Sequence, residues 1–522
     1  MEQNQNQYEN SRPPYPPAQP WPGYVPPKPP YQPPPRPAYP AGKREWWFAA
    51  AEVLSGFALA NCGIFAGDGL GFALAMMLSI CCSAAYLWSS GRKPGAYSLT
   101  LLSISLVIAI GFARSNDGFV KFVMLLFVLL AVNLALCIQA GQNRRQTAGF
   151  ASLLDGPRAL FVLGFGSMSP AFRGLFRGRT AENPGSKRTG AVLLGLAVTV
   201  PVLLIVLPLL ISADAAFEGF VELLPDFDFG ELFVTAVLGG GVACVLYTRG
   251  AALRHGPQPE KAKRRPGRVH AWTVNTVLIG LCAVYGAYLL SQLAYFVGGF
   301  SGVLPEGYNM AEYARRGFFE MAWLCVINLG IIALAVGLVE KGERTPLATR
   351  IFCLFVGIVT VFFVITASAK MGLYIGAYGL TRLRVLTEVI MVFLGLATLV
   401  VCIWLFAPKL PYMKVIVILA LVMGAAVLWA DVDTVVAAYN VRAYQSGALE
   451  TVDVQYLTEL SSGAVPYIIQ LAEDGNQTAR AWLAEESRVY YWCGDYDDLR
   501  EWNFADWLAG RLLEDWHSGG KG

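Results

Sequence analysis

The stretch AEYARRGFFE, residues 311 to 320, sets charged side chains directly against an apolar run. Asn309 followed by Glu312 is typical of a helix N-cap with an acid three residues later, so we expect a helix to begin there. Glu312, Arg316 and Glu320 then fall four residues apart on one face and alternate in sign. The spacing predicts an ion-paired stripe that leads from the start of the helix into the apolar run.

A second stretch, YGLTRLRVLTE at residues 378 to 388, repeats this arrangement. Arg384 precedes Glu388 by four residues at the beginning of another apolar run. Two interpretations stay open. Either the pairs stabilise the starts of two helices through local ion pairing and the helix dipole, or they line one polar cavity, of which Asp214 and Lys370 would be further members.

Sequence motifs for other chemistry are missing from the chain. The three histidines, His255, His270 and His517, lie outside the apolar runs, which argues against haem ligation and histidine-dependent membrane hydrolysis. We find no HExxH, GxSxG or P-loop pattern. The pair Asp226 and Asp228 suits a sugar transferase with a lipid-linked donor, but a solvated acidic loop explains it more simply. We therefore assign no catalytic residues, no metal and no cofactor.

The composition places these charged stretches in a membrane protein. Hydrophobic residues make up 55% of the 522 residues and charged residues 15%, and the mean hydropathy is +0.48, which is too apolar for an ordinary soluble domain. Apolar runs of about twenty residues recur, and a helix of that length crosses a bilayer. We therefore expect an all-α, polytopic membrane helix bundle with eleven spans. The predicted spans are 46–66, 70–90, 96–113, 119–140, 191–211, 232–248, 272–298, 317–339, 351–369, 385–407 and 415–430.

The distribution of basic residues predicts the orientation of these spans. With the N-terminus in the cytoplasm, most of the 40 Lys and Arg residues fall on the cytoplasmic side, as the positive-inside rule requires. The odd number of spans then places the C-terminus outside the cytoplasm.

Three segments are expected not to span. Residues 1–45 form a proline-rich cytoplasmic tail that we expect to be extended or disordered, either as a spacer or as a ligand for a proline-binding groove. Within the transmembrane domain, 46–430, the segment 150–178 mixes apolar residues with arginines, which suits an interfacial helix pair better than a re-entrant loop. Residues 431–522 form an acidic extracytoplasmic tail with helical periodicity, which we expect to fold as a small helical domain.

Four motifs resemble the hallmarks of a family of polytopic bacterial membrane proteins that is known only as a domain of unknown function. They are SADAAFEG, AEYARRGFFE, YGLTRLRVLTE and YLTELSSGAVP, in that order between about residues 150 and 470. The resemblance implies a bacterial cytoplasmic membrane, but no established activity or cofactor, so it supplies no catalytic residue. The matching positions are Asp214, Glu312, Tyr313, Arg315, Arg316, Glu320, Tyr378, Thr381, Arg382 and Arg384.

Two classes of function follow, with an enzyme third. An envelope sensor or assembly protein would bind protein partners through the proline-rich tail and the external tail. A transporter or lipid-handling protein would use an outward-facing polar cavity in contact with membrane lipid. A membrane glycosyltransferase-like enzyme is the third hypothesis, and nothing predicts binding of nucleic acid. The residues of the candidate cavity are Asp214, Glu312, Arg316, Glu320, Lys370, Arg384 and Glu388.

Overall fold

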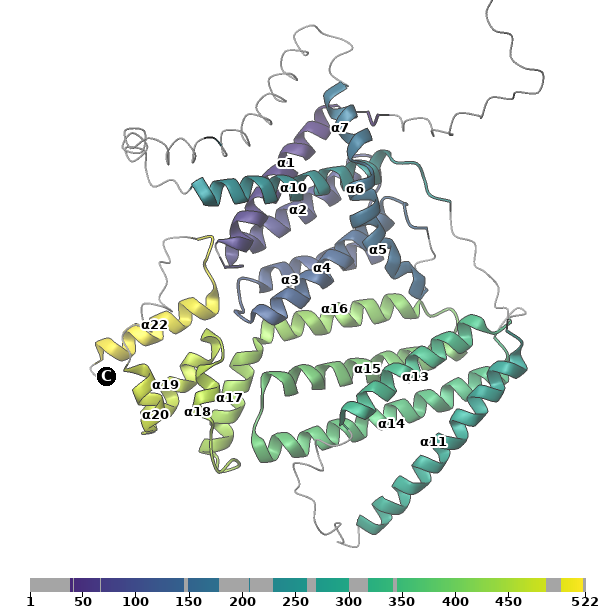
Figure 1. The fold of residues 1–522 in the computed structure, drawn as a ribbon, viewed down its shortest axis with the longest axis vertical. Helices are drawn as coiled ribbons and strands as arrows, with labels where there is room; N and C mark the ends of the chain where they lie inside the picture. Colours follow the sequence, from purple (N-terminus) through teal and green to yellow (C-terminus); the bar gives the residue numbers. More distant parts are fainter. Residues whose placement is uncertain are drawn as a thin grey trace, which may run out of the picture. The chain divides into compact units, whose positions relative to one another are not determined.

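The computed structural model confirms the predicted all-α fold (Figure 1). The structure describes residues 38–40, 42–65, 67–144, 149–177, 206, 229–260, 269–299, 318–340, 345–484 and 499–519. Within these ranges no β-strand is present, and the only strand-like pairing is an isolated bridge between Val269 and Val339.

Nine helices of the described residues are long and apolar enough to cross a membrane, and α3 (Ala96–Gly111) is a shorter apolar helix. The nine are α1 (Lys43–Ile64), α2 (Leu70–Trp88), α4 (Gly118–Gln139), α10 (Phe229–His255), α11 (Ala271–Gly299), α13 (Phe318–Leu338), α14 (Leu347–Tyr378), α15 (Arg382–Phe406) and α16 (Tyr412–Ala430). A helix lies at each predicted span except 191–211, of which only Val206 is within the described residues. The chain is a multi-pass membrane protein.

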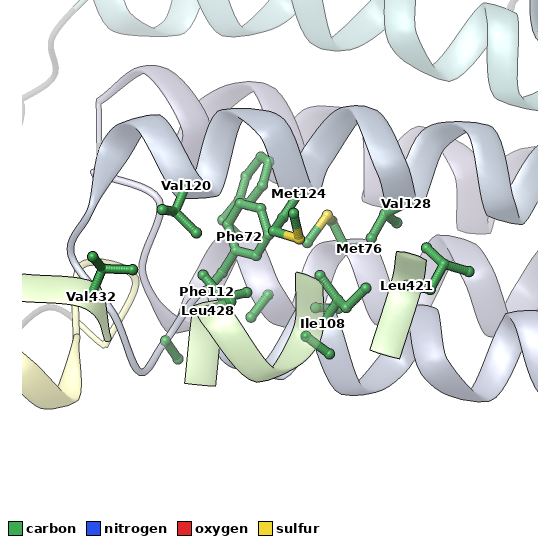
Figure 2. Packing of buried hydrophobic residues seen from close by; sticks show 14 of the residues in the cluster. Phe72, Met76, Ile108, Phe112, Val120, Met124, Val128, Leu421, Leu428 and Val432 are labelled. Carbon is green, nitrogen blue, oxygen red and sulfur yellow. The ribbon is translucent and has the colours of Figure 1, made fainter. Parts of the chain in front are cut away.

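The two larger clusters of buried apolar side chains hold most of the membrane helices together. In the first, α2, α3, α4 and α16 meet around residues such as Met76, Ile108, Met124 and Leu428 (Figure 2). The second joins α11, α13, α14 and α15 around residues such as Val359. Because α16 packs against both α3 and α15, it connects the two clusters. Inside a bilayer such contacts stabilise the bundle by close packing, since lipid tails are as apolar as the side chains.

Small residues allow α1 and α10 to approach each other closely. A Cβ added at Gly56 would lie 2.7 Å from the backbone nitrogen of Ala243 and 2.7 Å from the carbonyl oxygen of Gly239. A Cβ added at Gly239 would lie 2.8 Å from the Cα of Phe57, whereas one added at Gly240 meets nothing within 4 Å. Gly56 and Gly239 therefore belong to the backbone-to-backbone contact that small residues permit between membrane helices, and Gly240 does not.

The segment that was expected to lie at the membrane surface consists of short helical pieces. They are η1 (Phe150–Leu154), α5 (Asp155–Pro157), η2 (Arg158–Leu163), α6 (Gly164–Gly166) and α7 (Met168–Arg177). These pieces pack on α4 and α10, and the hydroxyl of Thr248 donates to the carbonyl oxygen of Gly164 at 2.6 Å. The position of the segment relative to the membrane surface stays a prediction.

The C-terminal segment, defined here as residues 431–484 and 499–519, is helical and shares the first core. Its helices are α17 (Val432–Gln445), α18 (Val454–Thr458), η3 (Ser462–Ala464), α19 (Val465–Glu473), α20 (Gln477–Leu483) and α22 (Phe504–Ser518). Val436, Leu457 and Leu513 belong to the same buried cluster as Leu101 of α3. The segment is therefore packed directly onto the membrane helices.

Backbone hydrogen bonds attach this segment to the start of α2. The N–H of Leu70 donates to the carbonyl oxygen of Trp502 at 2.9 Å, and the N–H of Gly71 donates to that of Arg500 at 3.1 Å. The first N–H groups of a helix have no partner within the helix, so the C-terminal segment satisfies donors that α2 leaves open. We call this end of the bundle, where Ile64, Leu70, Gly118 and Ala430 lie, the tail end.

Candidate functional site at the tail end

Two aspartates that directly follow the last membrane helix form the centre of a buried ion cluster. Asp431 has a φ of 54°, a region that residues other than glycine seldom adopt, and this conformation turns the chain from α16 into α17. Asp433 lies in the first turn of α17, where the helix dipole favours a negative charge. Both residues are 0% exposed. Carboxyl groups buried to this extent need hydrogen-bond or ionic partners.

Arg382, the first residue of α15, supplies the main partner. Its Nε and Nη2 donate to the two carboxylate oxygens of Asp433 at 2.8 and 2.5 Å, a bidentate geometry that suits a guanidinium group. The same Nε lies 3.3 Å from Oδ2 of Asp117, whose Oδ1 caps α4 by accepting from the N–H groups of Phe119 and Val120. One guanidinium group therefore joins α15, α17 and the start of α4.

The cluster also brings together two of the motifs noted in the sequence. The hydroxyl of Tyr456, in YLTELSSGAVP, accepts a hydrogen bond from the backbone N–H of Arg382, in YGLTRLRVLTE, at 2.9 Å. The backbone N–H of Ser461 donates to Oδ2 of Asp433 at 2.9 Å. Two motifs that are separated along the chain thus contact the same buried ion pair.

Asp431 lies beside this pair and has partners of its own. It accepts from the hydroxyls of Ser115 at 3.1 Å and Thr434 at 2.7 Å. Gly463 packs so closely on it that a Cβ would overlap the carboxyl group. Burial raises the pKa of Asp431, and the charge of Asp433 adds to this effect, although the two hydroxyls oppose it. The carboxyl group of Asp431 therefore holds its proton to a higher pH than that of an exposed aspartate.

Lys121 of α4 is a second cation in the cluster and, unlike Arg382, it is buried. It is 2% exposed, and its Nζ donates to the carbonyl oxygen of Asp68 at 3.1 Å. Asn116 donates to both carboxylate oxygens of Asp506, at 2.9 and 3.1 Å. Burial raises the pKa of both Asp68 and Asp506. The carboxyl groups that interact with the charge of Lys121 are those of Asp68, Asp117, Asp431 and Asp506.

This cluster is suited to holding two parts of the chain together and to responding to protons. Its acidic side chains outnumber its basic ones, and several are buried. In the part of the chain that the structure describes, no group of three or more His, Cys, Asp or Glu side chains is placed to hold a metal ion.

The predicted polar cavity is described only in part. Asp214, Glu312 and Arg316, and the hallmark residues Tyr313 and Arg315, lie outside the described residues. Glu320 lies in the first turn of α13 and is exposed. Its charge interacts with that of Lys370 on the adjacent helix α14, so these two predicted members lie near each other.

The remaining predicted members lie at the junction of α14 and α15. Thr381 caps α15 by accepting from the N–H of Arg384. The guanidinium group of Arg384 donates to the carbonyl oxygens of Tyr378, at 3.2 Å, and Gly379, and it lies 4.2 Å from the centre of the Tyr374 ring. Among the described residues, the buried Oε2 of Glu388 has no hydrogen-bond partner. Whether these groups share one cavity with Glu320 and Lys370 stays a prediction.

Sequence reasoning missed a buried polar centre within the membrane helices. Glu52 of α1 is 0% exposed and accepts from the hydroxyls of Ser79 at 2.9 Å and Ser83 at 2.7 Å. Arg249 of α10 is 3% exposed and donates to the same hydroxyl of Ser83 at 2.7 Å and to Oδ1 of Asn133 at 3.4 Å. Charged residues inside membrane helices are costly and are commonly paired. The sequence did contain a signal for this centre, because Glu52 lies inside the first apolar run and a carboxylate there needs a partner from another helix.

A second group of charged residues that the sequence did not indicate lies at the start of α1, away from the tail end. The Oε1 of Glu45 lies 3.2 Å from Nε2 of His255 and 3.6 Å from Nε of Arg254. The guanidinium carbon of Arg254 also lies 4.5 Å from the centre of the Tyr86 ring. These contacts join the start of α1 to the end of α10.

A family model described as Domain of unknown function (DUF4153) matches residues 96–471. The match extends from α3 to α19 and therefore includes Asp117, Arg382, Asp433 and Tyr456. It begins well before residue 150, where the resemblance in motifs began. No curated protein matches the chain, and no solved structure matches it.

Proposed function

Since this chain belongs to the family of the domain of unknown function DUF4153, we propose that its role depends on the ion cluster that attaches the C-terminal segment to the membrane helices. We propose an envelope sensor or assembly protein, in which the C-terminal segment binds a partner protein. The proline-rich N-terminal tail would bind a second partner on the other side of the membrane. No catalytic step enters this proposal.

The observation that carries the proposal is the set of contacts made by Arg382. Asp433 belongs to the C-terminal segment, whereas Arg382 and Asp117 stand at the starts of two membrane helices. A partner that shifts α17 would change the charge environment of α15 and α4 together. In a molecular switch, a local change of charge or packing shifts a larger structural element between two states, and the contacts of Arg382 could transmit such a change.

The proposal also keeps the predicted orientation, with the N-terminus in the cytoplasm of a bacterium and the C-terminal segment outside. The positive-inside rule supports this orientation. A reporter enzyme that is active only in the cytoplasm should be inactive when fused after Gly522, and active when fused before Met1. Activity of the reporter after Gly522 would show that the predicted orientation is wrong.

A photo-crosslinking experiment tests the proposed partner. A photoreactive residue at Tyr439, which is 40% exposed on α17, should give a discrete adduct with another protein in native membranes. The same residue at Trp323, which is 67% exposed on α13, should give lipid adducts and serves as the control. The adduct from position 439 should weaken in Arg382→Gln and persist in Arg511→Gln, because Arg511 is an exposed arginine outside the cluster. An adduct of equal intensity in wild type and Arg382→Gln would contradict the role of the cluster.

A transporter or lipid-handling protein is the second candidate, and the buried Glu52 and Arg249 favour it. Charged groups at membrane depth commonly mark a path for ions or substrates. In proteoliposomes on a solid-supported membrane, a pH step should produce a current that Glu52→Gln abolishes. If wild-type proteoliposomes give no more current than empty ones, this candidate loses its support.

A further inference from the structure

Helices α1 and α2 leave a groove of about 490 Å³ near the tail end. The volume falls within the range of roughly 300 to 1,000 Å³ that is usual for ligand sites. Apolar side chains line most of its length, among them Leu54, Phe57, Leu74 and Leu78. Leu54 and Leu74 are also 63% and 54% exposed, as expected for side chains that face lipid. An apolar chain, and not a polar metabolite, suits this part of the groove.

One end of the groove is polar, and the cation that lines it has an anion beside it. Arg500 and Asn61 line the groove there. Nη1 of Arg500 donates to Oδ1 of Asn61 at 2.7 Å and lies 3.5 Å from Oε1 of Glu231. Asn61 in turn donates from Nδ2 to the same oxygen of Glu231 at 2.6 Å. The side chains of Arg500 and Glu231 are 49% and 30% exposed, so a ligand at the mouth of the groove can reach both.

The position of Arg500 is fixed by the backbone. The N–H of Gly71 donates to its carbonyl oxygen at 3.1 Å, and a Cβ added at Gly71 would lie 2.9 Å from the Cα of Arg500. The C-terminal segment therefore holds a cation directly at the mouth of an apolar groove between two membrane helices. A preorganised site of this kind loses less entropy on binding than a mobile one.

We propose that this groove binds one membrane phospholipid with a primary-amine headgroup, such as phosphatidylethanolamine. An acyl chain occupies the apolar part between α1 and α2. The phosphate accepts from the guanidinium group of Arg500, and the ammonium group donates to the carboxylate of Glu231. The inference does not depend on the proposed sensor role, since it concerns a different surface of the chain.

The paired charges decide the headgroup. A purely anionic lipid such as phosphatidylglycerol would bind Arg500 but would add no cation beside Glu231 to offset its own charge. Phosphatidylcholine carries a cation, but its quaternary nitrogen has no hydrogen to donate. A zwitterion with a donor amine adds a charge-assisted hydrogen bond to each member of the existing Arg500–Glu231 pair, and such bonds are roughly twice as strong as neutral ones.

Native mass spectrometry of the full chain tests this inference. The protein in detergent is mixed with equal amounts of phosphatidylethanolamine, phosphatidylglycerol and phosphatidylcholine, and bound lipids are identified by mass. Wild type should retain one phosphatidylethanolamine in preference to the other two. Arg500→Gln should lower that affinity about tenfold or more, because a hydrogen bond to a charged group contributes about 1.5 to 3 kcal/mol. Arg500→Lys should restore part of it, which separates loss of binding from misfolding.

Two further variants and a control complete the test. Glu231→Gln should remove the preference for phosphatidylethanolamine over phosphatidylcholine. Leu74→Trp, at an exposed position on the wall of the groove, should fill the space and abolish retention of the lipid. Arg511→Gln should behave like wild type. Equal lipid occupancy in wild type and Arg500→Gln, or a preference for phosphatidylglycerol, would overturn the inference. A photoreactive residue at Leu74 that crosslinks only to residues 191–211 would overturn it as well, because a segment of the chain and not a lipid would then occupy the groove.

Discussion

Replacing Arg382 by glutamine should loosen the C-terminal segment from the membrane helices. The side chains of Asp433 and Asp117 are 0% and 1% exposed, and Arg382 is the cation that contacts both. Removing one partner of a buried ion pair leaves an uncompensated charge, which costs about 3 to 5 kcal/mol.

The expected cost here lies at the lower end of that range or just below it. The side chain of Arg382 is 36% exposed, so water screens part of the interaction. After the substitution, Asp433 keeps the N–H of Ser461 and Asp117 keeps the N–H groups that it caps. We therefore expect about 2 to 3 kcal/mol, which corresponds to roughly a 30-fold to 140-fold increase in the population of the detached segment.

Hydrogen–deuterium exchange measures this population directly. Amides of α19 (Val465–Glu473) should exchange faster in Arg382→Gln by that factor, because exchange follows the opening equilibrium of the segment. Arg442→Gln, at an exposed position of α17, should leave the exchange unchanged. The double variant Arg382→Gln with Asp433→Asn should recover part of the protection, since it removes one of the two orphaned charges. Equal exchange in Arg382→Gln and Arg442→Gln would refute the reasoning.

Three other predictions concern the contact of α1 with α10, Asp431 and Glu52. Gly239→Ala should destabilise the contact of α1 with α10 by about 1 to 3 kcal/mol through overpacking, whereas Gly240→Ala should not, because its Cβ meets no neighbour; equal thermal midpoints for the two variants would contradict this. Burial raises the pKa of Asp431 above its usual value of 3.8, so its contribution to stability is fully present below 3.8 and is lost as the pH rises through the raised value. Asparagine tolerates a positive φ, so Asp431→Asn should keep the backbone and make the thermal midpoint less dependent on pH. An unaltered pH profile would show that Asp431 does not cause the pH dependence of stability. Glu52→Gln should destabilise the bundle more than the double variant Glu52→Met with Arg249→Met, because the single change leaves a buried cation uncompensated; the opposite order of the two variants in chemical denaturation in detergent would contradict this.

The membrane helices could be predicted from the sequence because their signal is local. A run of about twenty apolar residues is sufficient to cross the hydrocarbon core, where backbone groups must bond within the helix. Caps are local as well. Asp117 precedes α4 and Thr381 precedes α15, and each accepts from N–H groups two or three residues later.

The candidate site was predicted less well, and Arg382 and Arg384 illustrate the reason. The two arginines are two residues apart, so they point about 200° apart around a helix of 3.6 residues per turn. The four-residue spacing to Glu388 drew attention to Arg384, whose guanidinium group instead bonds to carbonyl oxygens at the end of α14. Arg382 lies in the buried cluster because of residues on α17 and before α4. The rotation of α15 depends on its neighbours, which a local pattern does not contain.

The sequence by itself determined that this is a helical membrane protein, where most of its apolar helices lie, and its resemblance to an uncharacterised family. These features follow from hydropathy and local motifs, each of which is contained in a short window of residues. Only the tertiary structure decided that Ser115 bonds to Asp431, a residue 316 positions away, and that Arg500 lines a groove between α1 and α2. Such contacts depend on which helices are neighbours and how each is rotated, because buried charges find partners in space and not in sequence order.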